Sequence, residues 1–200
     1  MARKDIHWPN CDFKIGAVTI EDIPPTHFNE IAFAGKSNVG KSSLINALTG
    51  RNSLVRVSKT PGCTRQLNFF LLDEKIYLVD MPGYGFAERS KKEIASWNSL
   101  INDYLVGRKH LRRIFLLIDS RRGLTPADIK IMDLLDEKAV IYQIVLTKVD
   151  KVNKTEIEEV IKKIDHQSKK HPALHPDIIR TSSSEGYGIE ELRRAIEALM

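Results

Sequence analysis

Short apolar runs alternate with amphipathic stretches along this chain, and the alternation predicts a mixed α/β protein. Each run ends in polar or turn residues, which is typical of buried strands joined by helical crossovers in a mostly parallel sheet. The predicted strands are Ile31–Ala34, Leu67–Leu72, Ile76–Val79, Ile114–Ile118, Val140–Leu146 and Ile178–Ile179. Asp73–Lys75 joins two of them as a hairpin-like turn, which indicates one antiparallel edge strand.

Apolar residues recur at helical spacing between these strands. The predicted helices run from about Lys41 to Leu48, from Ile94 to Leu105, from Pro126 onward, over residues 154–166, and from about Ile189 onward. Thr125 is a suitable N-cap, because Pro126 fits the first helical position. Residues 1–28 predict an irregular lead-in with one short strand at 13–20, and residues 29–200 predict the main domain.

The composition fits a single domain and excludes few classes of binding partner. The 200 residues are 42% hydrophobic and 28% charged, which suffices for a full core. A net charge of +5 permits a nucleic-acid partner, although a solvated lysine face is the commoner explanation. Cys11 and Cys63 make no disulfide framework and suit a reducing cytosol. Without a signal peptide or a membrane-length apolar run, the sequence predicts a soluble cytoplasmic protein.

A phosphate-binding loop, or P-loop, is predicted where the first main strand meets the first helix. The pattern G-x-x-x-x-G-K-[ST] is matched by Gly35-Lys36-Ser37-Asn38-Val39-Gly40-Lys41-Ser42. Glycines let backbone N–H groups approach phosphate oxygens, and the helix N-terminus adds positive potential. Lys41 is expected to reach the β- and γ-phosphates, and Ser42 to supply a hydroxyl to Mg²⁺. A glycine-rich turn without a ligand is the alternative.

Two later strands end in carboxylates with complementary roles. In Asp80-Met81-Pro82-Gly83, the aspartate can hold Mg²⁺ through a water, and Gly83 can offer its N–H to the γ-phosphate. In Thr147-Lys148-Val149-Asp150, the aspartate can accept N1–H and N2–H₂ of guanine. Adenine lacks both donors, so guanine is the predicted base. Thr181-Ser182-Ser183 follows the last strand and can contact guanine O6, although a serine-rich turn is equally expected.

A switch segment is predicted over Ser58–Gln66, which would order with GTP and loosen after hydrolysis. One threonine there should complete the Mg²⁺ shell, and Thr64 is chosen over Thr60 because it lies nearer the next strand. Tyr84 follows Gly83, where Ras-like proteins have a glutamine that orients water. Hydrolysis is therefore expected to be slow and has no assigned general base, while Lys41 and Mg²⁺ stabilise charge.

With these segments in place, the chain resembles the Era/EngA/EngB/septin-like GTPases and is most similar to the bacterial EngB family. The residues that carry the resemblance are GKSNVGKSSLINALTG, SKTPGCTRQLNFF, VDMPGYGFA, DSRRGLTPAD and TKVDK, with Trp97 in the helix after the third segment. The resemblance covers nearly the whole chain from about residue 13, and GYGFA is more specific to it than the P-loop. It implies a Ras-like P-loop GTPase domain, in which helices flank a six-stranded, mostly parallel mixed sheet.

The resemblance also implies a function, because EngB-like proteins bind GTP and act in large ribosomal subunit assembly and in normal cell division and septation. It carries nucleotide contacts over to Gly35–Ser42, Gly62, Cys63, Thr64, Arg65, Gln66, Asp80–Gly83, Thr147–Asp150 and Thr181–Ser183. Ser42 and Thr64 are the implied Mg²⁺ ligands. The implied partners of a monomer are GTP or GDP, and the RNA and protein of the large subunit.

Lys41 and Asn38 are the candidate catalytic residues. In related GTPases an asparagine at the position of Asn38 holds K⁺ against the phosphates, although Asn38 can instead only cap its own loop. Thr147 stands where asparagine is commoner in GTPases, so a moderate affinity for the base is expected.

Basic residues cluster in Arg108–Arg113, in Arg121-Arg122 and in Lys162–Lys170, which permits a ribosomal RNA surface held by phosphate contacts. For any single cluster, a solvated face is the commoner explanation. Two rival functions fit less well. A nucleotide-metabolising hydrolase would need a general-base constellation, and a septin-like polymerising GTPase an extended coiled-coil tail, and the sequence offers neither.

Overall fold

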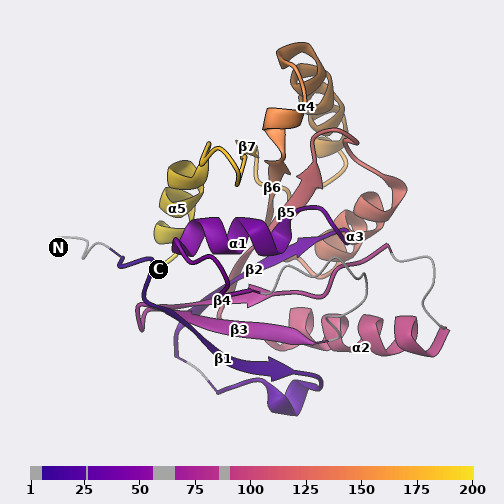
Figure 1. Ribbon diagram of the computed structural model, residues 1–200. Helices are drawn as coiled ribbons and strands as arrows, with labels where there is room; N and C mark the ends of the chain where they lie inside the picture. Colours follow the sequence, from indigo (N-terminus) through magenta and orange to yellow (C-terminus); the bar gives the residue numbers. More distant parts are fainter. Residues whose placement is uncertain (1–5, 26, 56–65, 86–90) are drawn as a thin grey trace.

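The computed structural model describes residues 6–25, 27–55, 66–85 and 91–200, without the side chains of 91–98. These residues form one seven-stranded sheet in the order β1-β3-β4-β2-β5-β6-β7 (Figure 1). The strands are β1 (Cys11–Ala17), β2 (Asn29–Gly35), β3 (Leu67–Leu72), β4 (Ile76–Asp80), β5 (Leu111–Asp119), β6 (Tyr142–Thr147) and β7 (Ile179–Arg180). β3 is antiparallel to both of its neighbours, and all other pairs are parallel. The carboxyl ends of the parallel strands therefore meet at one edge, where α/β proteins bind ligands.

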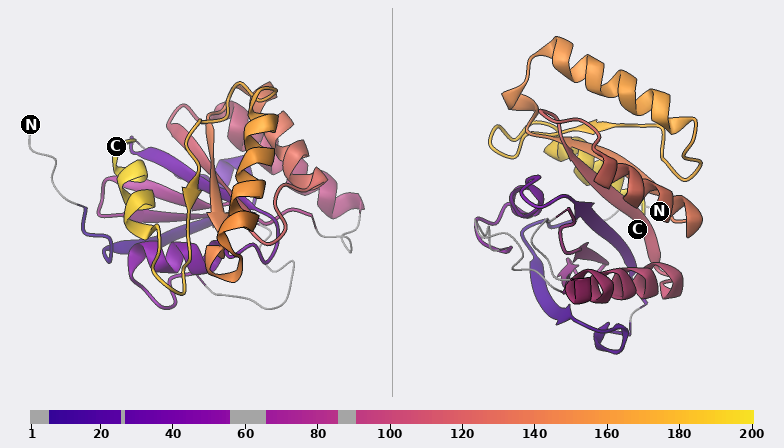
Figure 2. Two further views of the ribbon diagram at one scale, coloured as in Figure 1. Left: turned by 90° about the horizontal axis from the view of Figure 1, so that it is seen from above. Right: turned by 90° about the vertical axis from the view of Figure 1, so that its right-hand side faces the viewer.

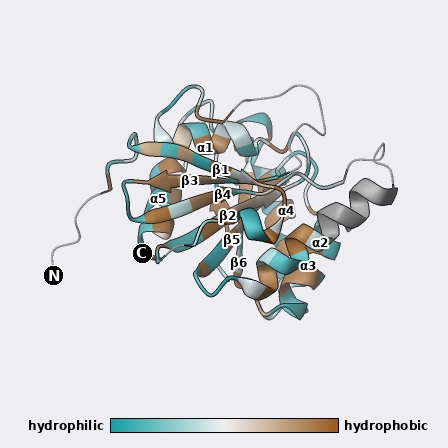
Figure 3. Cartoon of the chain, turned by 90° about the horizontal axis from the view of Figure 1, so that it is seen from below, coloured by the Kyte–Doolittle hydropathy of each residue, from teal (hydrophilic) through white to brown (hydrophobic). Residues whose placement is uncertain are grey.

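Helices cover both faces of this sheet (Figure 2). The helices are α1 (Lys41–Thr49), α2 (Lys91–Gly107), α3 (Pro126–Glu137), α4 (Lys154–Ser168) and α5 (Ile189–Glu197), with short 3₁₀ turns at Ile20–Asp22 and Val149–Lys151. α1 and α5 pack on one face with Phe33, whereas α2, α3 and α4 pack on the other with Ala32 and Ala34. Because side chains alternate along a strand, β2 contributes to both cores. Figure 3 shows hydrophobic residues both on the strands and on parts of the helices that cover them.

The lead-in adds a strand that moves the edge of the sheet. β1 begins at Cys11, earlier than the predicted strand, and pairs antiparallel with β3. The sheet therefore has seven strands instead of six, and β1 lies at its edge in place of the hairpin strand β3. Cys11 is buried, and burial raises the pKa of its thiol to about 12, which fits an unreactive free thiol. Cys63 lies outside the described residues.

The remaining predicted elements are confirmed, with boundaries that shift by a few residues. Thr125 is the N-cap of α3, as expected, in a capping box in which its backbone N–H donates to Asp128 Oδ2 at 2.7 Å. The turn Asp73–Lys75 joins β3 to β4, as the hairpin pattern predicts. Among the described residues, the structure has no helix of the length and hydrophobicity that a membrane span needs.

Candidate functional site

The loop between β2 and α1 has the conformation that the phosphate motif requires. Lys41 begins α1, and Gly40 precedes it at φ +108°, a left-handed value that favours glycine. Backbone hydrogen bonds join this loop to the segment after β4: Ser37 N–H donates to the Tyr84 carbonyl at 3.1 Å, and Tyr84 N–H donates to the Gly35 carbonyl at 3.3 Å. The predicted strand–loop–helix arrangement is confirmed, and the loop is fastened to a second motif.

Asp80 and Gly83 bring that second motif against the P-loop. Asp80 ends β4, is 1% exposed, and accepts a hydrogen bond from Lys41 Nζ. A Cβ built on Gly83 would lie 2.9 Å from Ser37 Oγ and 3.3 Å from Ser37 Cα, so a larger residue there would displace the loop. The two predicted phosphate motifs, distant in sequence, therefore form one surface.

Oxygen atoms on either side of Lys41 are suitable ligands for magnesium. Ser42 follows it in the first turn of α1, and Asp80 ends the neighbouring β4, which supplies a hydroxyl and a carboxylate. Mg²⁺ prefers one or two such oxygens together with waters and substrate phosphates, not an all-protein cage. The described residues contain no group of three or more His, Cys, Asp or Glu able to hold a metal. Thr64, the other predicted ligand, and Thr60 lie outside the described residues.

The predicted base-reading segment is tied to the P-loop by two hydrogen bonds. Thr147 Oγ1 donates to the Val39 carbonyl at 2.7 Å, and Lys148 Nζ donates to the Asn38 carbonyl at 2.7 Å. Both carbonyls belong to the P-loop, so the phosphate and base ends are held as one unit. A threonine in place of asparagine thus keeps a bond to the P-loop, although it lacks the amide.

Asp150 lies in the 3₁₀ turn after β6 with its carboxylate already ionised. A hydrogen bond from Ser182 and an ion pair with Lys151, at 3.0 Å, lower the pKa of Asp150. Val149 N–H donates to the Thr181 carbonyl at 3.2 Å, which joins this turn to the segment after β7. The structure therefore brings the two predicted base segments together, and their contact with guanine stays a prediction.

Asp119, at the end of β5, was given no role from the sequence. It accepts Lys148 Nζ at 2.8 Å and two hydrogen bonds from the Arg121 guanidinium, at 2.9 and 2.6 Å. Burial raises the pKa of Asp119, but the hydrogen bonds from Arg121 and Lys148 outweigh burial and lower it to about 2. This carboxylate therefore holds Lys148 beside the P-loop. Its place at the carboxyl end of a parallel strand is the signal that could have identified it.

Tyr84 is anchored on α3. Its hydroxyl donates to Asp128 Oδ1 at 2.7 Å, and Asp128 also accepts from the Thr125 hydroxyl at 2.6 Å. Burial and the nearby carboxylate raise the pKa of Tyr84 well above its usual range, so the hydroxyl remains a donor. The side chain that follows Gly83 is therefore used by the fold and does not supply a water-orienting amide.

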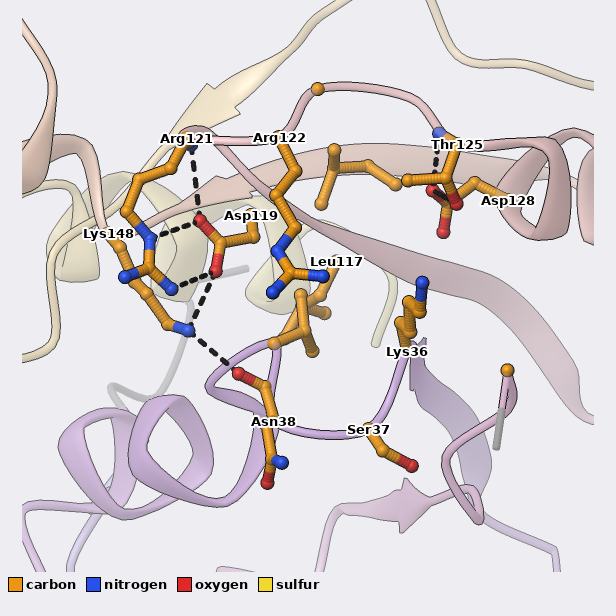
Figure 4. A pocket seen from close by; sticks show the side chains of 14 residues that line it. Lys36, Ser37, Asn38, Leu117, Asp119, Arg121, Arg122, Thr125, Asp128 and Lys148 are labelled. Atoms are coloured by element: carbon orange, nitrogen blue, oxygen red, sulfur yellow. Dashed lines mark hydrogen bonds and ion pairs between the residues drawn. The ribbon is translucent and has the colours of Figure 1, made fainter. Parts of the chain in front are cut away.

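A cavity of about 320 Å³ lies beside the P-loop, against the connection between β5 and α3 (Figure 4). Four cationic side chains line it, from Lys36, Arg121, Arg122 and Lys148. Figure 4 shows the Asn38 side chain pointing away from Lys148, whose ammonium meets the Asn38 carbonyl. The carboxylates of Asp119 and Asp128 line it as well, so the four cations leave a net positive charge that favours anions next to the loop that is expected to bind phosphates.

Much of the predicted switch segment falls outside the described residues, including Gly62, Cys63, Thr64 and Arg65. Gln66 is described, and its Nε2 donates to Asn68 Oδ1 at 2.9 Å. Its amide also packs against Gly16 of β1, where an added Cβ would lie 2.0 Å from Gln66 Nε2. The Gln66 side chain thus lies along the sheet edge, and its nucleotide contact stays a prediction.

The arginines between α2 and the start of β5, and those in its first residues, form hydrogen bonds within the fold. Arg108 pairs with the fully buried Glu30, and Arg112 and Arg113 donate to side-chain amides at 2.9 and 2.7 Å. Arg108 and Arg113 are therefore less available to RNA phosphates than the sequence indicates, whereas Arg112 is exposed, as are the lysines near the end of α4.

Known proteins share this sequence pattern. A family model described as 50S ribosome-binding GTPase matches residues 30–148. A probable GTP-binding protein EngB from Hyphomonas neptunium is 53% identical over 191 residues, which cover 94% of this chain and 87% of that protein.

Solved structures share the fold. A crystal structure of a probable GTP-binding protein engB matches with a TM-score of 0.67 and 28% identity, over 85% of this chain and 97% of that one. Era in complex with MgGDPNP and nucleotides 1506–1542 of 16S ribosomal RNA matches with a TM-score of 0.67 and 26% identity, over 86% of this chain and 56% of that one. The predicted Ras-like architecture is confirmed.

Proposed function

This chain belongs to the EngB family of GTP-binding proteins and is a GTPase, and from that premise we propose that it is a slow, magnesium-dependent switch in large ribosomal subunit assembly. The observation that carries the proposal is the pair of hydrogen bonds from Thr147 and Lys148 to the P-loop. They join the two ends of the nucleotide site, so phosphate occupancy and base recognition are coupled. A switch needs that coupling more than it needs fast chemistry.

The hydrogen bond that holds Tyr84 supports slow hydrolysis. Its hydroxyl is held by Asp128, so it cannot orient an attacking water as a glutamine would. Lys41 remains as a cation for the β- and γ-phosphates. Bound Mg²⁺ would neutralise charge on the same phosphates, with Ser42 and Thr64 as direct ligands and Asp80 acting through a water.

Potassium is the proposed second cation, with Asn38 as its ligand. Asn38 adopts a left-handed φ of 65°, and its side chain points away from Lys148 (Figure 4). Capping of its own loop is the competing role. Single-turnover GTP hydrolysis in matched potassium and sodium, for wild type and Asn38→Ala, distinguishes the two. Potassium should accelerate only the wild type, and equal wild-type rates in both salts would remove the ion from the mechanism.

The proposed partner is the large ribosomal subunit, which this chain would contact through both ribosomal RNA and ribosomal protein. We propose that the chain acts there as a cytoplasmic monomer. The name of the matching family and the exposed Lys169 and Lys170 at the end of α4 support this. Phosphate contacts would make such binding depend on shape and salt more than on sequence. A role in normal cell division and septation is proposed as a consequence of subunit assembly.

Cosedimentation with purified large subunits tests the proposal directly. The protein is loaded with GDP or with a non-hydrolysable GTP analogue, at two salt concentrations. We expect binding that differs between the nucleotide states and weakens with salt. Lys41→Ala, which should not hold nucleotide, serves as the control and should lose the difference. Equal cosedimentation in both states and without nucleotide would contradict a switch.

A further inference from the structure

A groove between α3 and α4 lies apart from the nucleotide chemistry. Both helices cover the same face of the sheet (Figure 2). The groove has a volume of about 850 Å³, within the range of roughly 300–1,000 Å³ that is usual for ligand clefts. Leu124, Pro126 and Ile129 form its apolar lining, and the side chains of Leu124 and Ile129 are half-buried against the core. This floor is a ready surface for apolar side chains.

Cationic side chains surround that floor. Lys162, Lys163 and His166 line the groove from α4, and their spacing of three and four residues places them on one face of the helix. Lys130 lines it from α3. Glu159 is the single carboxylate in the lining. The groove therefore combines an apolar floor with a positive rim contributed by both helices.

The lysines of this rim are exposed charges on the surface of the described part of the chain. Lys130, Lys162 and Lys163 are exposed, and within the described part of the chain none forms an ion pair. Arg108 differs, since it pairs with the buried Glu30. An exposed positive charge without an ion-pair partner lowers folding stability very little, and it attracts carboxylates of other molecules.

We propose that this groove docks an acidic amphipathic segment of a partner protein, with its apolar side chains on Leu124 and Ile129 and its carboxylates against the lysines. Helices bind apolar grooves in this way, through anchors on one face and charges beside them. The charge of the rim selects an acidic partner. The apolar floor favours protein over RNA, because a phosphate backbone leaves apolar side chains uncovered. The inference does not depend on the nucleotide site or on the ribosome.

The test uses fluorescence anisotropy with the full chain and defined probes. The main probe is a labelled helical peptide of about 15 residues with leucines on one face and glutamates beside them. Comparison probes are a shuffled peptide of the same composition, a peptide with glutamine in place of glutamate, and an oligouridine of similar length. The groove variant is Lys162→Glu with Lys163→Glu. Lys169→Glu with Lys170→Glu is the matched control, with the same charge change outside the groove lining.

We expect the patterned peptide to lose about tenfold in affinity for the groove variant and less than about twofold for the control. The shuffled and glutamine peptides should bind the wild type at least about tenfold more weakly. GDP titration should be unchanged in both variants, which shows that they fold. Ile129→Ser should weaken the patterned peptide as well, because it removes apolar floor without changing charge.

Several outcomes would overturn the proposal. They are the absence of patterned-peptide binding, an equal loss in both double variants, and equal binding of the patterned and shuffled peptides. Oligouridine that binds more tightly than the peptide and weakens in the groove variant would make this an RNA phosphate surface. A wild-type dimer in sedimentation that the groove variant dissociates would make a second copy of the chain the occupant.

Discussion

The phosphate end and the base end of the nucleotide site are held in different ways. At the phosphate end, Lys41 meets Asp80, and the two side chains are only 11% and 2% exposed. At the base end, Asp150 meets Lys151, whose side chain is 62% exposed. One charge pair is shielded by the fold, and the other has its cation in solvent.

This difference in exposure predicts that the two ends contribute differently to nucleotide affinity and to base selectivity. Removing one member of a shielded pair leaves the other without compensation, which is costly for folding and for binding. A pair with its cation in solvent is screened and contributes little by itself. Changes at the phosphate end should therefore decide whether a nucleotide binds, and changes at Asp150 should decide which nucleotide binds.

Lys41→Ala should have the largest effect. It removes the predicted contact with the β- and γ-phosphates. It also leaves the buried Asp80 carboxylate without its cation, and breaking a buried pair in this way lowers stability by roughly 3–5 kcal/mol. We expect GDP affinity to fall more than about hundredfold in titration calorimetry. Lys75→Ala is the control, because Lys75 pairs with Asp73 in the turn between β3 and β4. Affinity of the Lys41 variant within about threefold of the wild type would refute the assignment.

Asp150→Asn should come next, and its effect should be a change of preference. The amide keeps one acceptor oxygen but replaces the other carboxylate oxygen, and its charge, by an NH₂ donor that faces a guanine N–H, and hydrogen bonds to charged groups contribute roughly 1.5–3 kcal/mol. GTP affinity should fall about tenfold to hundredfold, while xanthine nucleotides should bind better than GTP. Competition titrations with GTP, XTP and ATP measure this. A wild type that binds ATP as tightly as GTP would remove Asp150 from base recognition.

Ser42→Ala examines the metal at the phosphate end. If the Ser42 hydroxyl is a Mg²⁺ ligand, GDP affinity in magnesium should fall about tenfold, with little change in EDTA. Ser43→Ala, the next residue of α1, is the comparison and should leave the difference between magnesium and EDTA intact. An equal loss for Ser42→Ala in magnesium and in EDTA would mean that its hydroxyl does not act through the metal.

Thr147→Val and Thr181→Val are the same chemical change at a threonine bonded to the P-loop and at one bonded to β6. Each buried hydroxyl donates to a carbonyl, Thr147 to Val39 at 2.7 Å and Thr181 to Leu146 at 2.9 Å. Both changes should lower the free energy of unfolding in urea by about 1–3 kcal/mol. Only the Thr147 change should also weaken GDP binding, by a few-fold, because it frees the P-loop. Equal GDP affinity in the two variants would show that this tie does not support the phosphate site.

Tyr84→Phe should have the smallest effect on function. It removes the hydrogen bond to Asp128, which Thr125 still contacts, so stability should fall by about 1–2 kcal/mol. The rate of single-turnover hydrolysis should stay the same, because the hydroxyl is committed to α3. A large loss of hydrolysis without a loss of stability would instead give this tyrosine a catalytic role.

Local sequence patterns were enough to identify the nucleotide motifs and the main helices and strands. The P-loop, the Asp80–Gly83 motif and the Thr147–Asp150 motif each depend on spacing within a few residues, and hydrophobic periodicity located the strands and helices. The capping of α3 by Thr125 is local in the same way. In each case the physical requirement, a turn, a cap or a repeat, is met by neighbours along the chain.

Contacts between groups that are far apart in the sequence depend on how the chain folds. Pairing of β1 with β3 joins Cys11 to Leu72 and creates the seventh strand. The contacts of Tyr84 with Asp128 and of Lys148 with Asp119 likewise cross long separations in sequence. Basic clusters that look alike in the sequence also have different surroundings. Some of their side chains are hydrogen-bonded within the fold, and others line the groove between α3 and α4. A side chain's charge and size are written in the sequence, but its partner depends on how the strands and helices are packed together.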